Sequence, residues 1–223
     1  MFYEEQIRGG CLPDHTLVLT YDDGPGPNTL PIAEYLRVKD IPATFFVIGK
    51  HARQWPEVLV RVSALGHRLG NHTWTHHGPD GLPSQLTTGG DVVDEVRRTA
   101  GLLPAIKPIA FRAPGGLWNT GVAKKLNDDA ALSNTHVGPF YWDVEGRDWQ
   151  AWREGSPPAA AAERYLAEIR DKKRGIVLLH DSSADGPEYV ATNRTYELTR
   201  ALVPMLIADG FRFAPLDEVV KAL

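Results

Sequence analysis

The stretch Leu17-Val18-Leu19-Thr20-Tyr21-Asp22-Asp23-Gly24-Pro25 joins an apolar run to two adjacent acidic residues and a turn. Its first half predicts a buried strand, and Gly24 and Pro25 predict a sharp turn after it. Because adjacent strand residues point to opposite faces, one carboxylate can bind a metal ion while the other stays free as a base. The alternative is a turn or helix-capping aspartate, and this segment alone does not separate the two interpretations.

Short apolar runs alternate with helical periodicity along most of the chain. Ile32, Tyr35 and Leu36 lie at helix spacing after the first run, and residues 93–103 repeat that pattern. Strand followed by helix, repeated, is typical of a parallel sheet. The predicted strands are residues 17–20, 43–48, 109–112, 140–144, 176–179 and 211–215, with a seventh near residues 67–70.

This number of strands is too small for a regular eight-unit barrel and too large for a small flavodoxin-like sheet. We therefore expect an α/β fold in the form of a distorted (β/α) barrel of about seven strand-helix units. The length of 223 residues favours one domain over residues 1–223. In such barrels the chemistry lies at the carboxyl ends of the strands, where residues 78–90 and 146–158 are expected to form long loops.

Composition excludes several classes of function. The formal net charge of −4 and the absence of a basic run argue against nucleic acid and anionic membranes as partners. Cys11 is the only cysteine, so a cysteine-based metal site or an intrachain disulfide is excluded. No apolar run is long enough to span a membrane, and residues 1–10 do not resemble a signal-peptide core, although a signal segment or anchor removed from the chain would leave export open.

His72 and His76 lie four residues apart, a spacing that places both imidazoles on one side of a helical turn. Surface or core histidines are the alternative for such a pair. Asp23 completes a set of two histidines and one carboxylate that suits a hydrolytic metal site with open coordination positions. Zinc proteases of this spacing carry a glutamate after the first histidine, but this chain has Thr73 there, so Asp22 is the candidate base.

Three further residues end or follow predicted strands and suit the same chemistry. Arg112 has a fixed fork of donors that can hold Asp22 ionised and aimed, although a surface arginine before a turn is the alternative. Gly115 can bring its backbone N–H close to a ligand as an oxyanion donor. His180 suits a general acid, with Asp148 as the carboxylate that keeps it protonated and Asp181 as the competing partner.

These motifs together resemble the polysaccharide deacetylase family, the NodB-homology domain of carbohydrate esterase family 4. The matching segments run in order over nearly the whole chain and are residues 20–25, 72–76, 112–116, 143–149 and 178–180. The resemblance implies one divalent metal ion held by Asp23, His72 and His76, with zinc first and Co²⁺, Mn²⁺ or Ni²⁺ as alternatives.

The same resemblance implies roles for the remaining motif residues. Asp22 would be the catalytic base and His180 the acid, with Arg112 orienting the first and Asp148 tuning the second. Trp149 and Leu178 would line a pocket for the acetyl methyl group, an assignment that rests on the resemblance alone. Two departures concern the substrate: His77 stands where the family usually has proline, and Gly115 stands where it usually has a large side chain.

The predicted activity is hydrolysis of acetyl groups from N-acetylglucosamine glycans, such as chitin oligomers or peptidoglycan, by a C–N hydrolase. An acetylxylan O-esterase, a cyclic-amide hydrolase and an inactive carbohydrate-binding module on the same fold are the alternatives. We expect an N-acetylated oligo- or polysaccharide as the partner, a monomer, and a secreted or envelope-associated protein, with a cytoplasmic location as the alternative. Trp74, Trp118 and Trp152 either pack in the core or stack on sugars.

Overall fold

β2 (Thr16–Asp22) lies at the centre of the fold, and all of its residues are buried. β3 (Ala43–Val47) and β7 (Arg174–His180) flank it as parallel neighbours, and β8 (Arg212–Phe213) pairs with its first residues. The last residue of β2, Asp22, is in register with His180 at the end of β7. The computed structural model describes residues 1–78 and 80–221.

The strands form two parallel sheets that curve into one barrel. One sheet has the order β4-β3-β2-β7, with β4 spanning Arg68–Asn71, and the other has the order β1-β6-β5. The strands of the second sheet are β1 (Phe2–Ile7), β6 (His136–Phe140) and β5 (Ile109–Ala110). Isolated bridges from Asn71 to Phe111 and from Val144 to Val177 join the two sheets. This arrangement is the distorted parallel barrel that the sequence predicted.

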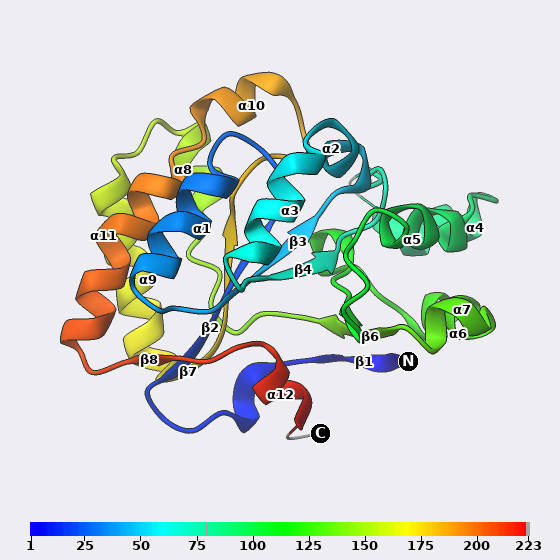
Figure 1. Ribbon diagram of the computed structural model, residues 1–223, viewed down its shortest axis with the longest axis horizontal. Coiled ribbons are helices and arrows are strands. Elements are labelled where there is room, and N and C mark those ends of the chain that lie inside the picture. Colours follow the sequence, from blue (N-terminus) through cyan, green and yellow to red (C-terminus); the bar gives the residue numbers. More distant parts are fainter. Residues whose placement is uncertain (79, 222–223) are drawn as a thin grey trace.

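Helices cover the outside of this barrel. In Figure 1, α1 (Thr29–Val38), α9 (Pro158–Lys172) and α11 (Thr195–Ala208) pack side by side against one face of β2 and β7. The remaining helices are α2 (Gly49–Gln54), α3 (Pro56–Ala64), α4 (Gly81–Thr87), α5 (Val92–Ala100), α6 (Thr120–Asn127), α7 (Ala130–Ser133), α8 (Asp148–Arg153), α10 (Pro187–Thr192) and α12 (Asp217–Lys221), with 3₁₀ turns η1 (Gly9–Cys11) and η2 (Pro114–Gly116).

Alternation of side chains along β2 decides which residues reach the barrel interior. Leu17, Leu19 and Tyr21 belong to the apolar cluster shared with α1, α9 and α11, whereas Val18 packs in the interior with residues from the other strands. Asp22 and Val18 are both even-numbered residues of β2, so the side chain of Asp22 also points into the barrel interior. By the same rule His180 shares the parity of Ile176, an interior residue of β7. The acid and the histidine thus meet at the carboxyl end of the barrel.

Several predicted element boundaries are wrong. The strand placed at residues 140–144 lies earlier, as β6, because Gly138 and Pro139 inside it read as a turn signal. The strand predicted at residues 109–112 is shorter, as β5. Both predicted long loops contain helices, α4 within residues 78–90 (Pro79 lies outside the described residues) and α8 within residues 146–158. β1 has no predicted counterpart, because only Phe2 and Ile7 of its six residues are buried.

Candidate metal centre and active site

Asp22 ends β2 and Asp23 directly follows it, but Asp23 does not continue the alternation of the strand. Asp23 has a φ of 73°, so the chain turns in the left-handed region immediately after Asp22. The expectation that the two carboxylates point to opposite faces is therefore wrong: each has an oxygen 3.6 Å from Nε2 of His72. The turn is held by His51, whose Nδ1 lies 2.7 Å from the carbonyl oxygen of Asp23.

His72 and His76 lie on a loop after β4 rather than on a helical turn, so that part of the prediction is wrong. Thr73 and His76 both have positive φ, which folds the loop tightly enough to bring the imidazole ring centroids within 4.9 Å. The buried carboxylate of Glu95 on α5 fixes this loop, since it accepts hydrogen bonds from the backbone N–H groups of Trp74 and Thr75 at 3.1 and 2.8 Å.

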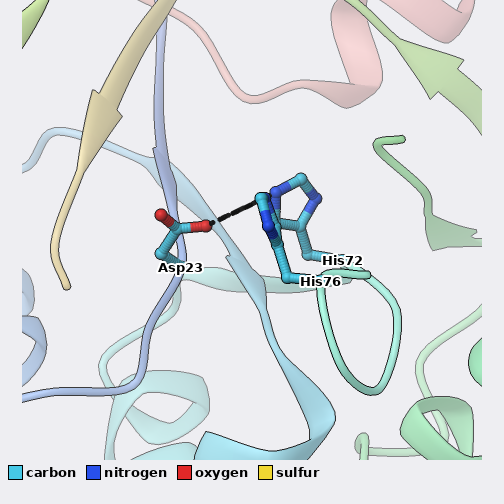
Figure 2. Close-up of side chains that lie close together, drawn as sticks. All are labelled: Asp23, His72 and His76. Atoms are coloured by element: carbon cyan, nitrogen blue, oxygen red, sulfur yellow. Dashed lines mark ion pairs between the residues drawn. The ribbon is translucent and has the colours of Figure 1, made fainter. Parts of the chain in front are cut away.

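Donor atoms of Asp23, His72 and His76 all lie within 4.8 Å of one another. Figure 2 shows the carboxylate of Asp23 pointing at both rings, and its Oδ1 lies 3.6 Å from Nε2 of His72 and 3.5 Å from Nε2 of His76. Among the residues that the structure describes, this buried Oδ1 has no hydrogen-bond partner. A buried carboxylate oxygen without a donor is costly unless a cation compensates it.

The protonation of His72 also suits a metal ligand. Its Nδ1 donates to the carbonyl oxygen of Arg112 at 2.9 Å, because a carbonyl only accepts, and Nε2 therefore carries the lone pair that faces Asp23. Burial, together with the nearby His76, lowers the pKa of His72 to about 3, so the ring is neutral. Two imidazoles and one carboxylate, with a partnerless buried oxygen among them, fit a divalent cation such as zinc.

Asp22 is clamped by Arg112, which is itself fully buried. Nη1 of Arg112 donates to Oδ1 of Asp22 and to the hydroxyl of Thr20, both at 2.8 Å, so the expected contact is present. The guanidinium also donates to the carbonyl oxygen of Tyr141 at 3.2 Å. Burial raises the pKa of Asp22, and the charges of Arg112 and His180 oppose this rise without cancelling it. The geometry leaves Oδ2 of Asp22 facing Nε2 of His72, 3.6 Å away.

His180 pairs with Asp148 on the opposite side of the site. Oδ1 of Asp148 accepts from Nδ1 of His180 at 2.7 Å, and its Oδ2 accepts from the backbone N–H of His180 at 2.8 Å. Burial lowers the pKa of His180, but the charge and hydrogen bond of Asp148, with Asp23 and Asp22, outweigh it and raise this pKa to about 10. Asp181, the competing partner, instead accepts from the hydroxyl of Thr29.

A cavity of about 400 Å³ contains both halves of this arrangement. The predicted substrate residues Gly115, Trp149 and Leu178 line it beside Asp22, Asp23, His72, His76 and His180. Gly115 has a φ of 59°, and no partner for its N–H occurs within the described part of the chain. Arg112 and Asp148 do not line the cavity but hold the residues that do.

Sequence reasoning missed several residues of this cavity. Trp142, Arg153 and Tyr189 line it, and the guanidinium of Arg153 lies 4.5 Å from the Tyr189 ring centroid. Asn193 holds the backbone next to the site, donating to the carbonyl oxygens of His180 and Ser182 at 2.8 and 3.0 Å. Only Trp142 carried a detectable signal, as an aromatic residue next to a strand end.

The tryptophans that were considered for sugar stacking belong mainly to the core. Trp74 and Trp152 are buried, and the indole N–H of Trp152 donates to the hydroxyl of Thr195 at 3.0 Å. Trp118 packs partly buried against Phe2 and Phe111. Trp149, in contrast, is 40% exposed at the cavity.

Fold and site together define a class of protein. It is a distorted parallel barrel whose carboxyl end carries a cluster of two histidines and one carboxylate. Beside this cluster lie an aspartate held by an arginine and a histidine paired with a second aspartate. The family model described as polysaccharide deacetylase matches residues 9–131. The chain belongs to this family, which is the NodB-homology family, carbohydrate esterase family 4.

Individual relatives agree with this assignment. The chain is 35% identical over 229 residues to a chitooligosaccharide deacetylase of Bradyrhizobium sp. (strain ANU 289), covering 98% of this chain and 97% of the relative. It is 28% identical to a peptidoglycan-N-acetylglucosamine deacetylase of Bacillus cereus, covering 92% and 88% of the two chains. The solved Bc1960 peptidoglycan N-acetylglucosamine deacetylase has the same fold, with a TM-score of 0.69 at 21% identity over 95% of this chain and 90% of that one.

Proposed function

We propose that this chain is a metal-dependent hydrolase that removes acetyl groups from N-acetylglucosamine units of chitin oligomers or peptidoglycan. The observation that carries the proposal is the convergence of three metal donors, a clamped carboxylate and an aspartate-paired histidine in one cavity. The names of the relatives support the substrate class, because they match nearly the whole length of the chain.

Asp23, His72 and His76 are the proposed ligands of one divalent ion, zinc first, with Co²⁺, Mn²⁺ or Ni²⁺ as alternatives. Such an ion, when bound, polarises the acetyl carbonyl and lowers the pKa of a water molecule. Asp22 then takes the proton of the attacking water, and Arg112 keeps its carboxylate oriented toward that water. The pKa of Asp22, raised by burial, makes it a stronger base than a surface aspartate.

The remaining residues act on the acetyl group and the departing amine. Gly115 directs its N–H, which has no partner among the described residues, at the oxygen that becomes negative when water adds to the carbonyl. His180, kept protonated by Asp148, gives its proton to the amine nitrogen as the C–N bond breaks, because an unprotonated amide nitrogen leaves poorly. Leu178 and the half-exposed Trp149 enclose the acetyl methyl group, and both line the cavity.

The test is acetate release from a panel of chitin oligomers, peptidoglycan fragments and acetylated xylan, with zinc and with a chelator. We expect acetate from the N-acetylated glycans, loss of release with the chelator and recovery on adding zinc. Acetate from xylan alone would establish the O-esterase alternative, and release from none of the substrates would leave the inactive carbohydrate-binding module.

We further propose that the protein acts outside the cell or at its envelope, because polymeric N-acetylated glycans are found there. We also propose that it acts as a monomer. Among the described residues, no helix is long and apolar enough to cross a membrane. Fractionation of cells with an antibody against the protein tests the location, and light scattering of the purified protein tests the oligomeric state.

A further inference from the structure

The strand β1 contacts the turn that carries Gly115, the proposed oxyanion donor, from outside the catalytic cavity. Gly115 lines the cavity and is followed by Gly116, and both have positive φ, 59° and 67°. Because glycine adopts positive and negative φ about equally well, the peptide groups of such a pair can rotate unless other contacts fix them. The direction of the Gly115 N–H therefore depends on the contacts that hold this turn.

Gln6 on β1 supplies one such contact from 110 residues away in the chain. Its side-chain Nε2 donates to the carbonyl oxygen of Gly116 at 2.9 Å. The hydrogen bonds inside the turn run to the carbonyl oxygens of Ala113 and Pro114, at 3.0 and 3.1 Å, and leave that of Gly116 free. Within the described part of the chain, Gln6 therefore provides the only hydrogen bond to this oxygen.

Only the donor half of the Gln6 amide is used. Its Oε1 is buried and has no hydrogen-bond partner among the residues that the structure describes. A buried acceptor without a partner costs free energy, and an apolar side chain of the same length would cover this surface without that cost. The bond to Gly116 is therefore what a glutamine contributes at this position and a methionine would not.

The two residues after this glutamine hold the adjoining wall of the cavity. The carbonyl oxygen of Ile7 accepts from the backbone N–H of Tyr141 at 2.8 Å. Nη1 of Arg8 donates to the carbonyl oxygen of Trp142 at 2.6 Å. The rings of Tyr141 and Trp142 stack with their centroids 3.9 Å apart, and Trp142 lines the cavity. A Cβ on Gly116 would overlap the Tyr141 ring, so the turn and the wall are in contact.

We propose that Gln6 is a positioning residue for the deacetylation reaction. By holding the carbonyl oxygen of Gly116, it keeps the N–H of Gly115 aimed at the oxyanion. Gln6 does not line the cavity, so it acts through this turn rather than on the substrate. The charge on the acetyl oxygen develops only as water adds, so a misdirected donor weakens stabilisation of the transition state and leaves substrate binding unchanged. The inference rests on the proposed function, because it takes the oxyanion from that reaction.

Steady-state kinetics of acetate release from chitin oligomers separates kcat from KM for the zinc-loaded wild type and three variants. Gln6→Met removes the donor and keeps the length of the side chain. Gln6→Lys keeps a donor and has no acceptor to bury. Glu4→Met is the matched control on the same strand, because Glu4 is exposed and does not line the catalytic cavity. Zinc affinity and Tm of each variant are measured alongside.

We expect Gln6→Met to lower kcat about 10-fold, which is less than the roughly 100- to 1,000-fold that removal of an oxyanion donor costs. KM and zinc affinity should be unchanged, Gln6→Lys should recover most of kcat, and Glu4→Met should match the wild type. A wild-type kcat for Gln6→Met, or an equal loss of kcat in Gln6→Lys, would overturn the inference. A loss of zinc affinity or of folding in Gln6→Met would assign the residue a structural role and overturn it as well. In each of these cases acetate release by the wild type still supports the deacetylase, whereas its absence would refute the proposed function.

Discussion

At the scale of single residues, Asp22 and Asp23 differ in the groups that fix their positions. Asp22 is fixed by the buried guanidinium of Arg112, whereas Asp23 is fixed through its backbone by His51 and through Oδ2 by Ala184. Only Asp23 has a buried oxygen without a partner among the described residues that faces both histidines. The two acids are therefore suited to different tasks, although they are adjacent in the chain.

Substitutions at the two positions should have separable effects. Asp22→Asn should lower kcat by about 100- to 10,000-fold, the usual contribution of a general base, with metal affinity retained. Asp23→Ala should lower zinc affinity by more than the roughly 10- to 100-fold that loss of an outer partner costs. Acetate release and zinc titration of both variants measure this difference. Near-normal turnover by the Asp22→Asn variant would show that Asp22 is not the general base.

The raised pKa of His180 predicts how the stability of the metal-free protein depends on pH. The pKa of His180 is about 10 in the folded protein against the ordinary value of 6.5, so the stabilisation is complete below pH 6.5 and is lost as the pH rises toward 10. The free energy of unfolding should fall by up to about 1.4 kcal/mol per pH unit in that window. Asp181 contributes in a lower window, because burial raises its pKa only to about 7.

Urea unfolding of chelator-treated protein between pH 7 and 10 measures this slope. In His180→Gln the slope should become nearly flat over the same range. If it stays as steep as in the wild type, another group is responsible and the pairing of His180 with Asp148 does not carry the effect.

At the scale of elements, α5 supports the loop that carries His72 and His76, the proposed metal ligands, from outside the cavity. Glu95 binds the backbone of Trp74 and Thr75, between the two histidines, so removing its carboxylate frees the loop. Glu95→Ala should weaken zinc binding by roughly 10- to 100-fold, as expected for an outer partner of the ligands.

Asp94→Ala is the matched control for Glu95. Asp94 precedes Glu95 on the same helix and pairs only with the exposed Arg98 among the described residues. Zinc titration should show wild-type affinity for this variant. Equal zinc affinities of Glu95→Ala and Asp94→Ala would mean that other contacts hold the loop. One such contact is the hydrogen bond that the backbone N–H of Thr73 donates to the side-chain oxygen of Asn71.

The sequence predicted the elements that have strong alternation and missed those that depend on tertiary context. The run at residues 17–20 and the helix around Val96 were found because their patterns are regular. The spacing of His72 and His76 predicted their pairing, but not the loop conformation, because the support of Glu95 comes from another part of the chain. Arg153 and Asn193 reach the cavity through packing of distant segments, which leaves no local pattern to detect.

At the scale of the whole molecule, metal binding should stabilise the fold. A ligand that binds only the folded state at 100 times its Kd adds about 2.7 kcal/mol to the free energy of unfolding. For a chain of this length the corresponding rise in Tm is roughly 5–10 °C. Thermal unfolding with and without zinc measures it, and Asp23→Ala should show no rise; an equal rise in that variant would place the bound ion elsewhere.

The segment from Ser182 to Asp185 has a consequence for how this protein can change during evolution. It lines the catalytic cavity, and the backbone N–H of Ala184 within it donates to Oδ2 of Asp23. An insertion there would reshape the catalytic cavity, and it would simultaneously displace a donor to Asp23. A change in the shape of the cavity at this segment would therefore also move the carboxylate of Asp23, so the two properties should change together.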